Sequence, residues 1–157
     1  MGYDGKIARG FVFGALIGLV SACSAPGGKP AEPTNPKQAL VLAEQGQQAF
    51  EQGQKLAARR AWQQAINLDP SAALVVNNLA LLLVEDREFA EAAALLTRGL
   101  QHSPDTAELH YNLAVVSELY LLDLNRALKH YQRYRDLSGQ DDAKVAGWIA
   151  DLERRLN

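Results

Sequence analysis

The middle of the chain repeats itself every 34 residues. Small residues recur at this spacing at Gly46, Ala80 and Ala114, and again at Ala58 and Ala92. A fixed period of this length indicates stacked copies of one supersecondary unit, none of which can bury its apolar face alone. The repeat therefore predicts an array whose function lies in the surface that the stack presents.

Composition favours a helical array. Hydrophobic residues make up 48% of the chain, and no run alternates with period two for long enough to predict a sheet. The formal net charge is -2, and the basic residues are scattered singly or in pairs, so no basic stripe is available for nucleic acid. We expect an all-α protein that does not bind nucleic acid.

The residues within each period follow one pattern: small side chains at positions 8, 20 and 27, a bulky one at position 24 and proline at position 32. With Ala39 as position 1, the first unit supplies Gly46, Ala58, Trp62, Ala65 and Pro70, and the second supplies Ala80, Ala92, Leu96, Gly99 and Pro104. The third unit slips by one residue, which places Ala127, Tyr131, Tyr134 and Gly139 at the later positions.

This pattern resembles the tetratricopeptide repeat. The resemblance implies an all-α fold in which residues 37–140 form three helix-turn-helix repeats, at about 39–72, 73–106 and 107–140, stacked as a short right-handed solenoid. Small residues would lie where two helices cross, and Trp62 and Leu96 would fill the space beside each crossing. The prolines would end one unit and begin the next.

The last segment, residues 141–157, reads as a closing helix. Its apolar residues recur at helical spacing and form one stripe: Val145, Trp148, Ile149, Leu152 and Leu156. An amphipathic helix with a charged outer side would cover the apolar face of the last unit. We therefore expect Trp148 to pack in the core rather than to contact a ligand.

The first 22 residues read as a signal peptide. Lys6 and Arg9 precede the apolar run 11–20, which suits a secretory signal but is too short to span a bilayer comfortably. The run is followed by Ser21, Ala22 and Cys23, which resemble a bacterial lipobox. This resemblance implies cleavage after Ala22, a diacylglyceryl thioether on Cys23 and acylation of the new amino group. The alternative is that Cys23 is a small residue in an ordinary signal sequence.

Residues 23–36 read as a tether. The segment from Ser24 to Pro36 holds four of the six prolines and cannot pack a core. In lipoproteins of this kind an aspartate after the cysteine retains the protein at the inner membrane, and Ser24 stands there instead. We therefore expect the periplasmic face of the outer membrane rather than the inner membrane, with the covalent lipid on Cys23 as the membrane anchor and no other cofactor.

In tetratricopeptide stacks the first helix of each unit lines a concave face, through positions 2, 5, 9, 12 and 13. Carried over, this implies a groove of Leu40, Ala43, Gln47, Phe50, Glu51, Leu74, Asn77, Leu81, Val84, Glu85, Glu108, Tyr111, Val115, Glu118 and Leu119. The groove is apolar with an acidic margin, and its lack of lysine and arginine differs from relatives that clamp a terminal carboxylate. It favours a partner segment carrying lysine or arginine, unless the glutamates serve only solubility.

Two smaller features leave alternatives open. Asn78 and Asn112 share position 6, which favours a bond between units, whereas Asn77 at position 5 is the better candidate to contact a ligand. The third turn, Tyr120 to Leu124, is apolar where turns are usually polar. We expect it to pack beneath the closing helix, the alternative being an exposed contact patch.

Catalytic motifs are absent from the sequence. His102, His110 and His130 form no metal-binding pair, and there is no phosphate loop or nucleophile elbow. We therefore expect no enzyme and no metal, but an adaptor for another envelope protein or peptide. The implied analogues are pilotins and lipoproteins that serve pilus, secretion or outer-membrane assembly. The alternative function is a carrier of a small molecule or lipid in the apolar trough.

Overall fold

The computed structural model describes residues 34–139 and 142–157, and these residues form seven α-helices within one compact unit. The helices are α1 (Pro36–Glu51), α2 (Lys55–Leu68), α3 (Ala73–Glu85), α4 (Phe89–His102), α5 (Ala107–Leu119), α6 (Leu124–Ser138) and α7 (Ala143–Leu156). The predicted signal peptide, Cys23 and most of the tether lie outside the described residues. Among the helices described, none is long and apolar enough to cross a membrane.

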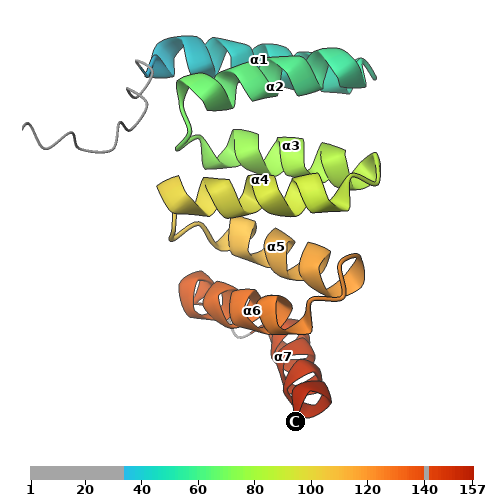
Figure 1. Cartoon of the computed structure of the whole chain (residues 1–157). Helices are drawn as coiled ribbons and strands as arrows, with labels where there is room; N and C mark the ends of the chain where they lie inside the picture. The colour runs from blue at the N-terminus through green and yellow to red at the C-terminus, as the bar shows by residue number, and fades with distance from the viewer. Residues whose placement is uncertain (1–33, 140–141) are drawn as a thin grey trace, which may run out of the picture. The chain divides into compact units, whose positions relative to one another are not determined.

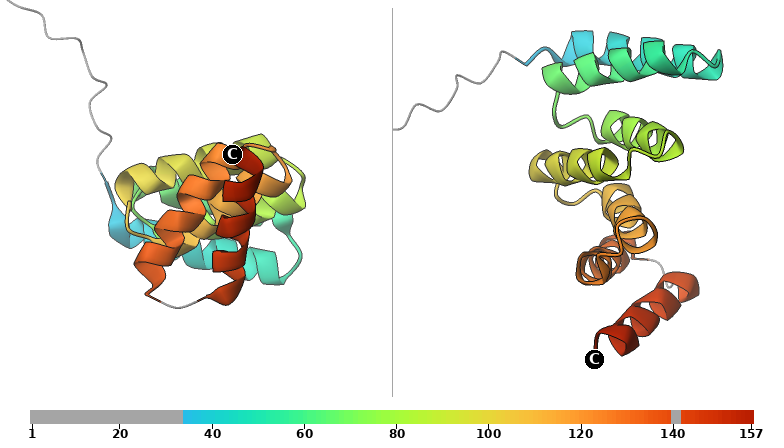
Figure 2. Two further views of the ribbon diagram at one scale, coloured as in Figure 1. Left: turned by 90° about the horizontal axis from the view of Figure 1, so that it is seen from below. Right: turned by 45° about the vertical axis from the view of Figure 1, so that its right-hand side comes forward.

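The helices stack as consecutive pairs. Helices α1 and α2, α3 and α4, and α5 and α6 pack within each repeat, while α2 packs on α3 and α4 on α5 (Figures 1 and 2). Helix α7 packs against α6 at the end of the stack (Figure 1). The expectation of an all-α solenoid of three repeats with a closing helix is confirmed.

The helix starts follow local chemistry. Proline at Pro36 occupies the first turn of α1, where its missing N–H costs nothing, and the Asn35 side chain accepts a hydrogen bond from the Gln38 N–H at 3.2 Å. At the other end of the domain the Asp142 carboxylate accepts from the N–H groups of Lys144 and Val145 and so caps α7. Helix α1 therefore begins before the first repeat position at Ala39, because the cap and the proline extend it.

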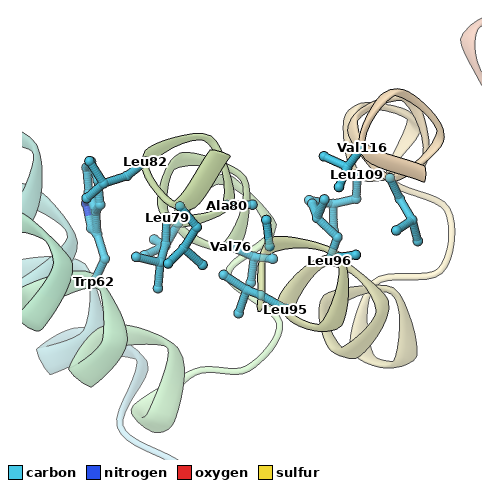
Figure 3. Close-up of a cluster of buried hydrophobic side chains, with 14 of the residues drawn as sticks. Trp62, Val76, Leu79, Ala80, Leu82, Leu95, Leu96, Leu109 and Val116 are labelled. Carbon is cyan, nitrogen blue, oxygen red and sulfur yellow. The ribbon is translucent and has the colours of Figure 1, made fainter. Parts of the chain in front are cut away.

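Small residues mark the helix crossings, as the repeat pattern predicted. Ala58 and Ala92 are completely buried. A Cβ atom added to Gly46 would lie 2.4 Å from Cδ1 of Trp62, so only glycine fits beneath that ring. The indole N–H of Trp62 donates to the Ala43 carbonyl at 3.2 Å. The core that begins at Trp62 continues through α3 and α4 to Leu109 and Val116 of α5 (Figure 3).

The third repeat contains the extra residue that its slipped register implies. Three residues connect α1 to α2 and α3 to α4, whereas four connect α5 to α6. Each turn places one residue at positive φ: Gly53 at 74°, Arg87 at 64° and Leu122 at 54°. A second core cluster then joins Ala127 and Tyr131 of the third repeat to the buried stripe of α7.

Two packing expectations are wrong. The turn after α5 does not lie as a whole beneath the closing helix: Leu122 is 75% exposed, Leu121 packs against the first core cluster, and the ring of Tyr120 stacks on Phe89 of α4, with centroids 4.1 Å apart. Of residues 120–124, only Leu124, at the start of α6, packs against the cluster that includes α7. The cause is that α7 packs on α6, so the turn stays at the side of the stack. Trp148 is 37% exposed rather than buried: Val145, Ile149 and Leu152 fill the contact, and the Trp148 ring packs at its margin, with its centroid 5.5 Å from that of Tyr131 and 6.3 Å from that of Tyr111.

Candidate binding face

The exposed sides of α1, α3 and α5 together form what we call the first-helix face. Large apolar side chains are exposed on it at repeat positions 2, 9, 12 and 13. Leu74 is 73% exposed, Leu81 48% and Phe50 39%, and Leu40 and Leu119 are also exposed. A side-chain hydrogen bond links two of these helices: the amide of Asn78 in α3 donates to the side-chain oxygen of Gln47 in α1 at 3.5 Å. Exposed apolar groups gathered on one face indicate an interaction surface.

An apolar pocket of about 220 Å³ lies between the first and second repeats. Its lining consists of Gln47, Phe50, Trp62, Asn78, Leu81, Leu82 and Glu85. The rings of Phe50 and Trp62 are tilted, with centroids 5.6 Å apart, and form its wall. The indole N–H is already bonded to the main chain of α1, so this wall presents apolar surface. The pocket is suited to an aliphatic or aromatic side chain.

An acidic pocket of about 290 Å³ lies between the second and third repeats. Its lining consists of Asn77, Glu108, Tyr111, Asn112, Tyr134 and Asp142. The Tyr111 and Tyr134 rings have centroids 5.2 Å apart. The repeat pattern identified Asn77, Glu108 and Tyr111, but it missed Tyr134 and Asp142. Tyr134 occupies a position where the repeat calls for a small residue, and this departure was the available signal.

The asparagines bond between repeats. The Asn112 amide donates to the Asn77 side-chain oxygen, and the Asn78 amide reaches Gln47. The expected inter-unit role of Asn78 and Asn112 agrees with the structure. Asn77, expected to be available for a ligand, is half-buried and lines the acidic pocket, and its side-chain oxygen accepts this bond.

Glu118 is not part of the acidic margin, contrary to the sequence-based expectation. Its side chain is only 16% exposed, accepts a hydrogen bond from the Tyr131 hydroxyl at 3.1 Å and lies 3.6 Å from Arg155 of α7. Burial, and then the neighbouring Glu118 carboxylate, raise the pKa of Tyr131. Glu118 therefore joins α5 to α6 and α7, a contact that repeat spacing alone does not reveal.

The remaining predicted residues divide by exposure. Glu51, Glu85 and Glu108 are exposed, whereas Val84 packs against the core and Val115 against the second core cluster. Glu85 pairs with Lys55 at 2.6 Å, and this hydrogen bond raises the pKa of Lys55. The acidic margin of the face thus consists of three glutamates, and one of them, Glu85, forms an ion pair with Lys55.

A larger hollow, of about 430 Å³, lies on the opposite side, between α2 and α4. Polar and apolar groups mix in its lining, which includes Gln63, Asn67, Arg98 and Gly99. We assign the candidate site to the first-helix face, because the large exposed apolar side chains Phe50, Leu74 and Leu81 gather there. Size alone does not identify a binding site.

A histidine pair joins α5 to α6 away from the first-helix face. The Nδ1 atoms of His110 and His130 are 2.8 Å apart, and His110 Nε2 is 2.9 Å from the Pro104 carbonyl oxygen. A carbonyl can only accept, so His110 carries its proton on Nε2 and accepts at Nδ1 from His130. Burial, and then the electrostatic effect of the neighbouring His110, Lys129 and Arg126 side chains, lower the pKa of His130 to about 4.

Comparison with known proteins agrees with this architecture. The family model described as "Tetratricopeptide repeat" matches residues 43–105 and 77–119. No curated protein sequence matches the chain. Similar solved structures include the first tetratricopeptide domain of Spaghetti (RPAP3) bound to the HSP90 peptide SRMEEVD, with 20% identity and a TM-score of 0.68, covering 78% of this chain and 96% of that one.

Two further structures are similar to a comparable degree. The Arabidopsis OM64 tetratricopeptide domain is 18% identical with a TM-score of 0.64, and covers 76% of this chain and 97% of that one. The TPR2B domain of yeast Sti1 in complex with an Hsp70 peptide is 17% identical with a TM-score of 0.64, over 76% and 98% of the two chains. The described part of the chain thus has the tetratricopeptide-repeat fold.

Proposed function

We propose that this protein is a lipid-anchored periplasmic adaptor that holds a segment of another envelope protein on its first-helix face, in the manner of lipoproteins that serve pilus, secretion or outer-membrane assembly. The exposed apolar side chains Phe50, Leu74 and Leu81 carry the proposal. Left uncovered, they expose apolar surface to water, and a partner that covers them gains about 25 cal/mol per Å² buried.

The charges of the face support a partner unlike the acidic peptide SRMEEVD named with one of the similar structures. Glu51, Glu85 and Glu108 line or border the face, and the residues of its two pockets include no lysine, arginine or histidine. A carboxylate-rich peptide would meet like charge here, whereas a segment with lysine or arginine would be attracted.

The carrier alternative receives less support. Both hollows on this face open to the surface and have volumes of about 220 and 290 Å³. Sites for drug-sized ligands typically enclose roughly 300–1,000 Å³ and bury most of the ligand. A lipid chain would find no enclosed cavity in these two pockets, so an open face for a polypeptide fits better.

The anchor is tested by substitution of Cys23. Because Cys23 is the only cysteine, Cys23→Ser should leave the protein unprocessed or soluble in the periplasm, while the wild type fractionates with the outer membrane. Mass spectrometry of the mature amino terminus checks the lipid directly. A wild-type protein that is soluble, unlipidated and begins elsewhere would contradict the proposed anchor.

The binding face is tested by crosslinking in intact cell envelopes, followed by titration of the recovered partner. Leu81→Asp and Phe50→Ala should weaken capture at least about thirtyfold, the loss typical of residues at the centre of an interface. Gln64→Ala, an exposed change on α2, is the control. Folded Leu81 and Phe50 variants that bind as tightly as the wild type would move the binding surface elsewhere, with the Tyr120 to Leu122 turn next to be tested.

A further inference from the structure

We propose that the first-helix face recognises its partner through two side chains of opposite character: a lysine or arginine in the acidic pocket and an aliphatic or aromatic residue in the apolar pocket. This inference rests on the proposed function, because it assumes that the face binds a polypeptide. It adds which side chains the partner must present and where each one lies.

The acidic pocket is built for a cation. Glu108 comes from the first turn of α5, and Asp142 precedes α7, so two carboxylates from separate elements converge on one hollow. Glu108 takes part in none of the ion pairs formed by the described residues. The helix-capping bonds of Asp142 use Oδ1 and leave Oδ2 available. Two carboxylates without a cation in the lining attract a basic side chain.

The aromatic wall supports the same ligand. The Tyr111 and Tyr134 rings stand 5.2 Å apart at an interplanar angle of 55°, so a flexible basic side chain entering the pocket meets ring surface as well as carboxylate. A guanidinium or ammonium group gains from contact with the face of an aromatic ring. Carboxylates alone would attract any cation, including a hydrated metal ion, whereas rings beside them favour an organic cation on an apolar stem.

The amides of the acidic pocket match a polypeptide backbone. Asn77 and Asn112 both line the pocket, and after the bond from Asn112 to Asn77 the Asn77 amide N–H groups and the Asn112 side-chain oxygen form no other hydrogen bond among the described residues. A peptide main chain offers one acceptor and one donor per residue. The pocket therefore combines a site for the basic side chain with partners for the backbone that carries it.

The apolar pocket differs because its charge is already neutralised. Glu85 is its only carboxylate, and Lys55 lies 2.6 Å from Glu85. The remaining wall is the surface of Phe50, Trp62, Leu81 and Leu82, which gains most from burying an aliphatic or aromatic side chain. The two pockets thus discriminate between side chains, and their order along the stack fixes the direction in which the partner segment lies.

The test uses the full chain, purified in a mild detergent, and a library of random 12-residue peptides. Enriched peptides should carry lysine or arginine together with a large apolar residue. For one such peptide, replacing the basic residue with glutamine should weaken binding about tenfold, as should the double variant Glu108→Gln/Asp142→Asn. Asparagine is as good a helix cap as aspartate, so α7 should stay capped.

A matched control removes two charges outside both pockets, by Asp136→Asn with Glu153→Gln, and should leave the affinity within about twofold. The two tenfold losses should not add: on the Glu108/Asp142 variant, the glutamine peptide should bind about as well as the original peptide, because both changes remove one contact.

The outcomes separate this inference from the proposed function. Peptides that lose binding on Leu81→Asp but bind equally with or without a basic residue would overturn the two-pocket assignment and leave the binding face in place. A library from which no enriched peptide depends on Leu81 or Phe50 would overturn both. Equal losses for the Glu108/Asp142 variant and for the control variant would reduce the effect to general electrostatic attraction and would also overturn the assignment.

Discussion

Gly46 and Trp62 show how one position constrains another across a helix crossing. Trp62 fills the space at the bulky repeat position, and its Cδ1 atom stands where a side chain on Gly46 would begin. In the second repeat Ala80 and Leu96 occupy the same two positions, and the smaller leucine leaves room for a methyl group. The bulkier residue at one position is thus accompanied by the smaller residue at the other, as expected for a close-packed interior.

Gly46→Ala should lower the free energy of unfolding by about 1 to 3 kcal/mol, because the added methyl overpacks the crossing against Trp62. The matched control is Gly147→Ala in the interior of α7, where a Cβ atom meets nothing within 4 Å. It should raise stability by about 0.5 to 1 kcal/mol, since alanine is the better helix former. Urea unfolding of both variants measures the difference. If both substitutions stabilise, the packing at Gly46 is misjudged.

The turns carry residues in the left-handed region at equivalent places. Only the first repeat uses glycine there, at Gly53, whereas Arg87 and Leu122 occupy the strained conformation with a Cβ atom. The left-handed region costs an ordinary residue roughly 1 to 2 kcal/mol. The repeat geometry therefore holds Arg87 and Leu122 in a backbone conformation that is unfavourable for residues with a Cβ atom.

Leu122→Gly should raise the free energy of unfolding by up to about 1 kcal/mol, because it relieves this strain and the lost side chain is 75% exposed. The greater freedom of glycine in the unfolded chain offsets part of the gain. Thermal unfolding at matched concentration provides the measurement, with Leu119→Gly, in the last turn of α5, as the destabilising control. A Leu122→Gly protein that melts earlier than the wild type would mean that the exposed leucine contributes packing.

At the scale of the helix, α7 is the element that completes the third repeat. Its buried stripe, Val145, Ile149 and Leu152, joins Tyr131 and Ala127 in the second core cluster. Arg155 adds the contact to Glu118. Removing this helix would expose the apolar side of α6, in keeping with the need of repeat arrays for a capping element.

Leu152→Ala should cost about 2 to 5 kcal/mol, because the leucine is completely buried between α6 and α7. Leu156→Ala, four residues further along the same stripe but 36% exposed, is the comparison and should cost less than half as much. Chemical denaturation followed by circular dichroism measures both. Similar losses for the two variants would show that α7 is held only loosely.

The sequence predicted most of this element structure, for a physical reason. Crossings need small residues and unit junctions need prolines, so the repeat spacing located the helix pairs and even the extra residue in the third turn. Contacts between units were harder to predict from the sequence. The burial of Glu118 and the entry of Asp142 into the acidic pocket depend on where α6 and α7 lie, which local periodicity does not encode. The exposed turn at Leu122 was mispredicted for the same reason.

At the scale of the whole molecule, the stack is held by contacts between neighbouring repeats, many of them polar. Arg59 of the first repeat donates two hydrogen bonds to Glu88 of the second, at 2.5 and 2.7 Å, and this pairing lowers the pKa of Glu88 to about 2. Within the third repeat, the hydrogen bond between His110 and His130 joins α5 to α6, and His110 is buried there. The free energy of unfolding should therefore depend on pH, and Glu88 and His130 should affect it over different pH ranges.

The histidine pair sets the sign and the window of that response near neutral pH. Folding lowers the pKa of His130 from an ordinary value of 6.5 to about 4, so between these values the unfolded chain binds a proton that the folded chain does not. The free energy of unfolding therefore rises with pH through this window, and the stabilisation is lost progressively as the pH falls from about 6.5 toward 4.

Between pH 7.5 and 5.0 the wild-type domain should lose about 1 to 2 kcal/mol, less than the full shift because His130 is only partly buried. His130→Gln keeps an amide donor for His110 Nδ1 but cannot titrate, so its stability should change little over the same range. Urea unfolding at several pH values in this range compares the two proteins. Acidic side chains such as Glu88 lose their charge below this window, and that loss also lowers the free energy of unfolding. The comparison is therefore confined to pH values above 5. Parallel pH profiles for wild type and His130→Gln would show that the histidine pair does not control the response.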